Sequence, residues 1–287
     1  MTKQRESRQS TFKPLAAGAE PRQANLAADA TPRESPPESD GEYRTELDSL
    51  GEVRVPASAY WGAQTQRAIG NFPVSGRRAH VELVRAYVAV KKACALANQA
   101  LGKLDSRRAS AICRACDDVL LRNMLLDQWV VDIFQAGAGT SLNMNTNEVL
   151  ANRAMEFLGK SRGQYHALSP NDHVNMSQST NDTFPTALHV AALLLWKPLR
   201  RALEQLARDL STKARVFNSV IKSGRTHLQD AVPIRLGQEF AAYAAAVREA
   251  TEYIDRNTEA LHEVALGGSA VGTGLNTHER FASTAVA

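Results

Sequence analysis

A polar stretch, Asn171–Pro185, holds the residue types in this sequence that are best suited to chemistry. Its fifteen residues read NDHVNMSQSTNDTFP and include three Asn, two Asp, two Ser, two Thr, one His and one Gln. Short neutral hydrogen-bonding side chains can bind a small polar ligand at a low cost in conformational entropy. An apolar helical pattern begins near Thr186, so Ser179–Thr183 can cap a helix N-terminus, where backbone N–H groups and the helix dipole favour anions. The stretch therefore predicts a carboxylate-binding site.

Two further clusters of neutral polar side chains lie elsewhere, and we predict that they belong to the same site. The run at 137–150 begins with GAGTS, where two glycines permit close backbone approach before a helix. It lacks the Gly-Lys-Ser/Thr ending of a phosphate-binding loop, so a nucleotide site is not expected, and a capped helix with an Asn-rich first turn is an equal alternative. The third cluster, KSGRTHLQDAVP at 222–233, contains Thr226 and His227.

Long helices must position these clusters. Apolar residues recurring three and four positions apart predict a helix that begins at Val81 and ends at Leu101–Gly102, with Lys91 in its inward stripe. Further helices are predicted over Ser106–Leu121, from Thr186 toward Phe217, and over Leu236–Val264.

Proline, glycine and β-branched residues indicate the remaining local structure. Pro198 should bend or divide the helix that begins at Thr186. A short strand is predicted at Val53–Val55, bounded by Gly51 and Pro56. Four glycines in Gly267–Thr277 predict a tight irregular turn.

Composition argues against several classes of protein. Apolar residues make up 44% of the 287 residues, and the net charge of +4 comes without a Lys/Arg run interleaved with aromatics, so nucleic-acid binding is not expected. No apolar run approaches the ~20 residues of a membrane span. Cys113 and Cys116 have metal-ligand spacing, but no second pair or nearby His completes a site, so we favour core packing and expect no metal.

The N-terminal 42 residues differ in composition from the rest. They hold five of the eleven prolines and almost no large apolar residue, which predicts a disordered extension at 1–42. The polar start lacks the apolar core of a secretion signal, and the three cysteines suit a reducing compartment, so we expect a cytoplasmic protein.

Four runs together resemble the aspartase/fumarase superfamily: GAGTSLNMNTNEVLAN at 137–152, NDHVNMSQSTNDTFP at 171–185, GRTHLQDAVPIRLGQEF at 224–240 and LGGSAVGTGLNT at 266–277. The resemblance extends from about Tyr43 to the C-terminus. It implies an all-α fold, with a mixed helical N-terminal lyase domain at 43–178 and an incomplete central helical bundle at 179–287. Ser141 and Thr180 favour the aspartate ammonia-lyases, and class II fumarases are the alternative.

The resemblance implies reversible elimination of ammonia from L-aspartate to fumarate, without a cofactor, in a homotetramer. Ser179 and Thr180 would face the β-carboxylate, Asn181 would lie near the amino group, and Thr226 with His227 would hold the α-carboxylate, His227 in a supporting catalytic role. The implied substrate-binding residues are Thr140, Ser179, Thr180, Asn181, Thr226 and His227.

The chain departs from the family pattern in one respect. In relatives, the serine that acts as the catalytic base lies on a mobile loop of the form Gly-Ser-Ser-x-Met-Pro-x-Lys-x-Asn. No such run occurs in these 287 residues. We therefore expect a chain truncated at its C-terminus and impaired in catalysis. A non-catalytic fragment that oligomerises is the alternative from another functional class.

Overall fold

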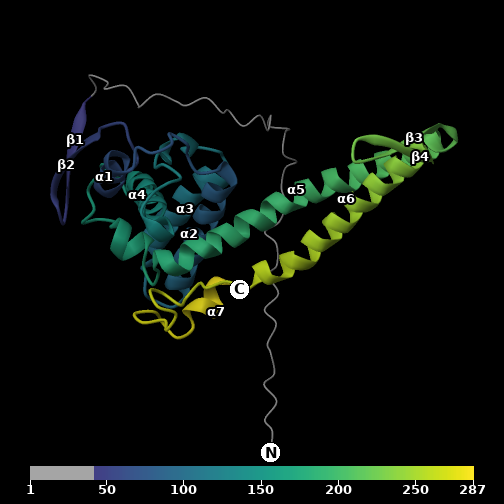
Figure 1. Cartoon of the computed structure of the whole chain (residues 1–287). Helices are drawn as coiled ribbons and strands as arrows, with labels where there is room; N and C mark the ends of the chain where they lie inside the picture. The colour runs from purple at the N-terminus through teal and green to yellow at the C-terminus, as the bar shows by residue number, and fades with distance from the viewer. Residues whose placement is uncertain (1–41) are drawn as a thin grey trace, which may run out of the picture. The chain divides into compact units, whose positions relative to one another are not determined.

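The computed structural model describes residues 42–287, which are mostly helical (Figure 1). The predicted all-α class is confirmed, and the extension predicted at 1–42 lies, up to residue 41, outside the described residues. None of the described helices is long and apolar enough to cross a membrane. In chain order the elements are β1 (Tyr43–Asp48), β2 (Gly51–Pro56), α1 (Ala63–Asn71), α2 (Val81–Ala100), α3 (Ser106–Leu120), η1 (Leu126–Gln128), η2 (Gly137–Gly139), α4 (Thr140–Phe157), η3 (Pro170–Val174), α5 (Thr180–Val216), η4 (Phe217–Ser219), β3 (Ile221–Thr226), β4 (Gln229–Arg235), α6 (Leu236–Thr258), η5 (Glu259–His262) and α7 (Phe281–Ala285).

Internal contacts divide the chain into two units. The first holds the residues up to Leu188 together with Val264–Ala287, and the second is His189–Glu263. Helix α5 begins in the first unit and continues into the second. The domain boundary expected between residues 178 and 179 stays a prediction.

The β1–β2 hairpin confirms the strand predicted around Val53–Val55. The strands are antiparallel, in register from Tyr43 opposite Pro56 to Asp48 opposite Gly51. Gly51 closes the turn with a φ of +113°, a conformation that favours glycine.

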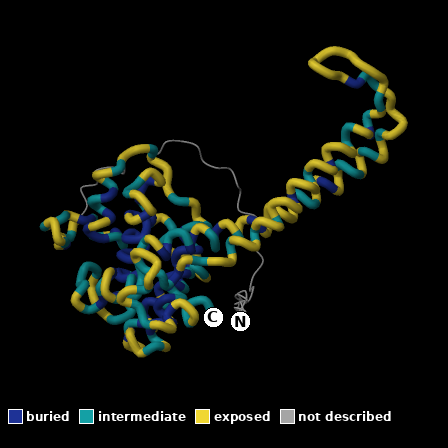
Figure 2. The backbone as a smooth tube through the Cα atoms, turned by 60° about the horizontal axis from the view of Figure 1, so that its bottom comes forward, coloured by how far each residue is buried: buried dark blue, intermediate teal, exposed yellow. Residues whose placement is uncertain are grey.

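Helices α2, α3 and α4 form the core of the first unit, where Figure 2 shows the buried residues concentrated. The α2 and α3 helices occupy nearly the predicted ranges, because both have local start signals. His80 caps α2 by accepting from the Glu82 N–H at 3.2 Å, and Asp105 caps α3 by accepting from the Arg108 N–H at 3.0 Å. Burial of each large apolar side chain contributes roughly 1.5–3 kcal/mol to stability. The largest buried apolar side chains include Tyr87, Ile112, Trp129, Leu142, Leu150 and Met155.

Helix α4 is buried along most of its length although its sequence is rich in polar residues. Several of these buried polar side chains have specific partners: Trp129 Nε1 donates to Thr146 Oγ1 at 2.9 Å, and Asn145 Oδ1 accepts from the Val130 N–H at 2.9 Å. Burial of hydrogen-bonded amides avoids the cost of unpaired ones. The Asn-rich run is therefore an internal scaffold as well as a helix start.

Helix α5 differs from the prediction at its start and in its continuity. It begins at Thr180 rather than Thr186, because Ser179 and Asp182 cap it. It runs unbroken for 37 residues through Pro198, so the expected division there is wrong. A proline inside a helix removes the hydrogen bond to the carbonyl four residues earlier, at a cost of about 3 kcal/mol. The many other hydrogen bonds of so long a helix offset that cost.

The second unit consists of the later part of α5, the β3–β4 hairpin and α6. The polar cluster at 222–233 forms this hairpin, with a two-residue turn between Thr226 and Gln229. Helix α6 ends at Thr258 and is followed by η5, short of the predicted end at Val264. Most residues of this unit are exposed (Figure 2).

Candidate functional site

Ser179 begins α5 through a reciprocal capping arrangement. Its hydroxyl oxygen accepts from the Asn181 N–H at 3.2 Å, and Asp182 Oδ1 accepts from the Ser179 N–H at 2.9 Å. These two bonds satisfy donors that a helix start otherwise leaves unpaired. The dipole of α5 makes the same end favourable for an anion. The local sequence thus produces the polar helix start that was predicted, and anion binding there stays a prediction.

Thr180 lies against the start of α4. Asn143 Nδ2 donates to Thr180 Oγ1 at 2.9 Å, and Thr140 lies about one turn before Asn143, exposed, with its hydroxyl donating to the Gly137 carbonyl at 3.1 Å. Gly139 has a φ of +79°, and a Cβ there would lie 2.3 Å from the Phe184 ring of α5. A glycine at 139 therefore lets the two helix starts approach closely.

The glycine-rich segment 267–277 is held against the start of α5. Asp182 Oδ2 accepts from the Gly267 N–H at 3.1 Å and from the Ser269 N–H at 2.9 Å, and its side chain is almost fully buried. Asn181 Nδ2 donates to the Ala270 carbonyl at 2.8 Å. The irregular turn predicted for this segment is present, and the structure adds that it forms hydrogen bonds with Asn181 and Asp182.

Beneath this helix start lies Lys91, a residue that the sequence analysis did not assign to the site. Its Nζ donates to Asn143 Oδ1 at 2.7 Å, Asn175 Oδ1 at 2.8 Å and Gln178 Oε1 at 2.8 Å, and the side chain is fully buried. A lysine within the inward stripe of α2 was the signal that could have identified it, because unpaired lysines are almost never buried.

The surroundings of Lys91 change its acid–base properties. Burial lowers the pKa of Lys91 to about 7, while Cys94, Asp182 and Cys116 act in the opposite direction. Burial also raises the pKa of Cys94 to about 12 and raises the pKa of Tyr87 above its usual value. The Tyr87 ring lies 5.4 Å from Lys91 Nζ. Within the described residues this is a strongly perturbed cluster next to the polar helix start, a combination typical of functional sites.

Thr226 and His227 belong to the second unit, whereas the other predicted site residues belong to the first. They lie at the exposed turn between β3 and β4, with a φ of +51° at His227 and +60° at Leu228. Positive φ angles at both turn residues are unfavourable for non-glycine side chains. The structure thus brings together Thr140, Ser179, Thr180 and Asn181 around two helix starts, and places Thr226 and His227 on a separate hairpin.

The first half of the polar stretch has a structural function. Residues 170–174 form the single wide turn η3, in which Ser169 Oγ accepts from the Asp172 N–H at 3.1 Å and His173 Nδ1 accepts from the Ser169 N–H at 2.8 Å. Partial burial and the nearby Arg108 lower the pKa of His173. These contacts fix the turn that leads into Asn175 and Gln178.

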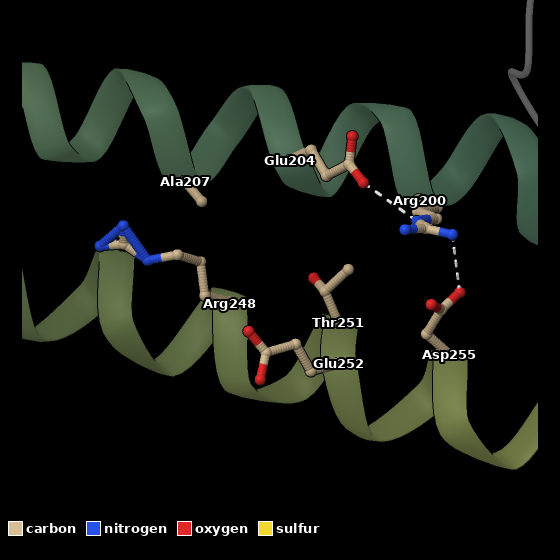
Figure 3. Close-up of a pocket in the computed structure, with 7 residues that line it drawn as sticks. All are labelled: Arg200, Glu204, Ala207, Arg248, Thr251, Glu252 and Asp255. Carbon is tan, nitrogen blue, oxygen red and sulfur yellow. Dashed lines mark hydrogen bonds and ion pairs between the residues drawn. The ribbon is translucent and has the colours of Figure 1, made fainter.

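Two other features carry no predicted site residue. A hollow of about 210 Å³ lies between α5 and α6 in the second unit, where Arg200 pairs with Glu204 and Asp255 (Figure 3). Cys113 and Cys116 face the core of the first unit as free thiols, and burial raises the pKa of both, so the core-packing interpretation is confirmed.

Known proteins resemble this chain over most of its length. The profile of a family described as lyase matches residues 51–287. A class II fumarate hydratase of Halobacterium salinarum is 56% identical over 245 residues, covering 85% of this chain and 52% of the relative. An aspartate ammonia-lyase of Bacillus subtilis is 50% identical over 240 residues, covering 84% of this chain and 50% of the relative.

Solved structures give the same result. A fumarate lyase:delta crystallin from Brucella melitensis superposes with a TM-score of 0.81 at 51% identity, covering 85% of this chain and 53% of that one. A class II fumarase from Schistosoma mansoni gives a TM-score of 0.79 at 38% identity, covering 85% of this chain and 51% of that one. The chain spans about half the length of the relatives it matches. By sequence and by fold, this chain belongs to the lyase family of aspartases and class II fumarases.

Proposed function

We propose that this chain holds the substrate of an aspartate ammonia-lyase reaction, the reversible elimination of ammonia from L-aspartate to give fumarate. The observation that carries the proposal is the start of α5, where Ser179, Thr180 and Asn181 present neutral polar groups at a helix N-terminus. In this reaction a base removes a proton from Cβ, and the β-carboxylate takes up the developing negative charge. Preoriented donors and a helix dipole stabilise such charge without reorganisation.

Each predicted residue has a proposed role in that step. Ser179 and Thr180 donate to the β-carboxylate, and Asn181 lies near the leaving amino group. Thr140 adds a contact from the start of α4. Thr226 and His227 hold the α-carboxylate from the hairpin, His227 also as a supporting catalytic residue. In the homotetramer implied by the family resemblance, polar clusters from different copies of the chain complete one another.

Class II fumarase activity is the second candidate. It is favoured by the 56% identity to the Halobacterium salinarum fumarate hydratase, which exceeds the identity to the Bacillus subtilis aspartate ammonia-lyase. Thr180 favours the ammonia-lyase, because class II fumarases usually carry a serine at this place. Both reactions share fumarate, so the helix start serves either one.

The proton acceptor is the missing part of this proposal. The Gly-Ser-Ser-x-Met-Pro-x-Lys-x-Asn run that carries it in the family does not occur in these 287 residues. Loss of a catalytic base commonly lowers a rate by ~10²–10⁴. We therefore expect the 287-residue chain to bind dicarboxylates and to turn them over slowly or not at all.

The test combines binding with turnover on the purified chain. Calorimetric titration with fumarate should show saturable binding that Thr180→Val weakens and Thr212→Val, an exposed hydroxyl of the same helix, leaves unchanged. Fumarate absorbance should then be followed with L-aspartate and L-malate supplied separately. Fumarate release from L-malate alone would replace the ammonia-lyase assignment by the fumarase one, and absence of any dicarboxylate binding would overturn both.

A further inference from the structure

Lys91 is a buried cation, and its burial is unfavourable unless its contacts compensate for the lost hydration. An ammonium group loses several kcal/mol of hydration on burial, even after relaxation. A methionine of similar length would fill the same space without that cost. The three side-chain oxygens around Nζ match the three N–H donors of an ammonium group, so the site is built for the charged form.

The ammonium group also fixes the orientation of the Asn143 side chain. Because an ammonium group carries no acceptor, it must face an amide oxygen, and here it contacts Asn143 Oδ1 at 2.7 Å. The Asn143 NH₂ group must then point the other way, where it donates to Thr180 Oγ1 at 2.9 Å. The Gln178 amide is fixed in the same manner, with its NH₂ group donating to the carbonyls of Val174 and Met176, each at 3.0 Å.

This chain of hydrogen bonds determines what the Thr180 hydroxyl can do. Since its oxygen already accepts from Asn143, its hydrogen is left to donate. Among residues 42–287 that hydrogen has no acceptor, and it lies at the helix start proposed to bind a carboxylate. The Lys91 charge, which only Asn143 separates from Thr180, thus sets the direction in which Thr180 donates.

We propose that Lys91 is a positioning residue: through Asn143 it makes the Thr180 hydroxyl an obligatory donor toward a bound dicarboxylate. This inference rests on the proposed function. Lys91 does not contact the substrate. It orients the Asn143 amide, which in turn orients the Thr180 hydroxyl that donates to the ligand. Its hydrogen bonds connect α2 with α4 and with the segment that precedes α5.

Several titratable groups face Lys91 and define when it is charged. Tyr87 and Cys94 face it from α2, Cys116 from α3 and Asp182 from the start of α5. Asp182 is the carboxylate in this set, and its oxygens already accept hydrogen bonds from the N–H groups of Ser179, Gly267 and Ser269. Loss of the Lys91 proton would remove one of the three donors and free the Asn143 amide to rotate.

The first test compares two adjacent lysines on α2 in the full chain. Lys91→Met should weaken succinate binding roughly tenfold or more, because hydrogen bonds that depend on a charged group are typically the strong ones. Lys92→Met is the matched control, since Lys92 pairs with Asp117 on the surface of α3, and its affinity should stay unchanged. Both variants are checked for cooperative unfolding and unchanged far-ultraviolet circular dichroism.

A second variant separates positioning from packing and remains informative if Lys91→Met does not fold. Asn143→Asp keeps an oxygen for Lys91 but replaces the NH₂ donor by a second acceptor. The Thr180 hydroxyl must then turn inward and donate to the aspartate. We expect tighter packing, seen as a higher unfolding midpoint, together with weaker succinate binding. A purely structural Lys91 predicts the higher midpoint with unchanged binding.

A double-mutant cycle and a ligand-free measurement complete the test. The binding losses of Lys91→Met and Thr180→Val should be far from additive, because without the hydroxyl Lys91 has nothing left to position. Additive losses would overturn the proposal. In the free protein, the nuclear magnetic resonance signals of the Asn143 side-chain amide and of Lys91 Cε should change over the same pH range. If the wild-type chain binds no succinate, the proposed function fails. The pH dependence of the two signals still tests Lys91: one common pH range supports orientation of Asn143 by Lys91, and two different ranges contradict it.

Discussion

At the start of α4, one glycine controls how closely α5 can approach. Gly139 combines a φ of +79° with a Phe184 ring carbon 2.3 Å from the place of a Cβ. Gly137, two residues earlier, has open space around the same position. The two glycines are alike in sequence, and their neighbours in space make them different.

Gly139→Ala should therefore destabilise the first unit and weaken dicarboxylate binding. The left-handed conformation alone costs an alanine roughly 1–2 kcal/mol, and displacement of Phe184 adds to that cost. Denaturant unfolding measures the loss of free energy, and calorimetry with fumarate measures the loss of affinity. Gly137→Ala is the matched control, which should change neither quantity by more than about 0.5 kcal/mol. Equal effects of the two substitutions would contradict the close approach of the helix starts.

At the scale of elements, a buried carboxylate of α4 holds the start of α1. Glu148 accepts from the backbone N–H groups of Gly62, Gln64 and Thr65, at 2.8, 2.9 and 3.1 Å. Burial raises the pKa of Glu148 to about 7, although these hydrogen bonds lower it. The contact therefore connects a helix start to the polar interior of α4.

This shifted group predicts a pH dependence with a definite sign. Because the folded pKa of about 7 lies above the ordinary 4.5, the folded state binds more protons between these pH values. The contribution of Glu148 to stability is thus fully present below pH 4.5 and lost as pH rises through 7. The free energy of unfolding should therefore decrease as pH rises from 4.5 to 7, and Glu148→Gln should make this decrease smaller. Urea titration at several pH values measures both.

Glu156, also on α4, is the control for this prediction. Burial raises its pKa, but Arg153 and Arg162 outweigh that effect and hold the pKa of Glu156 below its ordinary value. Its stabilising contribution is therefore present above pH 4.5 and lost as pH falls. Glu156→Gln should leave the decline between pH 4.5 and 7 in place, and a flat profile in that variant would show that Glu148 is not the source.

The β3–β4 hairpin carries unfavourable backbone angles at the place where two site residues are proposed. Leu228 has a φ of +60° and is 94% exposed, so its side chain gains no burial in return. Leu228→Asn should stabilise the hairpin by up to about 1 kcal/mol, because asparagine tolerates this conformation better. Hydrogen exchange of the β3–β4 amides measures the gain. Faster exchange in the variant would show that the turn is not under strain.

At the scale of the whole molecule, the second unit exposes several large apolar side chains. Leu194, Leu199 and Leu206 of α5 and Tyr253 of α6 are all more than two-fifths exposed. Long helices with uncovered apolar side chains are typical of bundles completed by further helices. We propose that other copies of the chain cover this surface, in line with the homotetramer that the family resemblance implies.

Self-association should therefore depend on concentration and on these leucines. Sedimentation velocity of the chain at rising micromolar concentrations should show species larger than the monomer. The double variant Leu199→Gln, Leu206→Gln should shift the equilibrium toward monomer, whereas Lys197→Gln, an exposed polar site on the same helix, should not. A strictly monomeric wild-type chain at all concentrations would count against the oligomer.

Local features were predictable from the sequence because neighbouring residues determine them. The α2 and α3 ranges follow from apolar spacing and from the caps His80 and Asp105, all within a few positions of the helix ends. The polar helix start at Ser179–Asn181 and the membership of the lyase family also followed from contiguous motifs. Of the two outcomes expected at Pro198, a bend or a division, the division was wrong, because one lost hydrogen bond weighs little in a helix of 37 residues.

Only the tertiary structure decided which of these polar residues act together. Asp182 reaches Gly267 and Ser269 across 85 and 87 positions of the chain, and Lys91 reaches Asn143 across 52. Such pairs leave no local pattern, since burial of a charge is favourable only when distant segments supply its partners. The sequence by itself thus determined the family and the polar helix start, whereas folding decided that a buried lysine contacts Asn143 beside it.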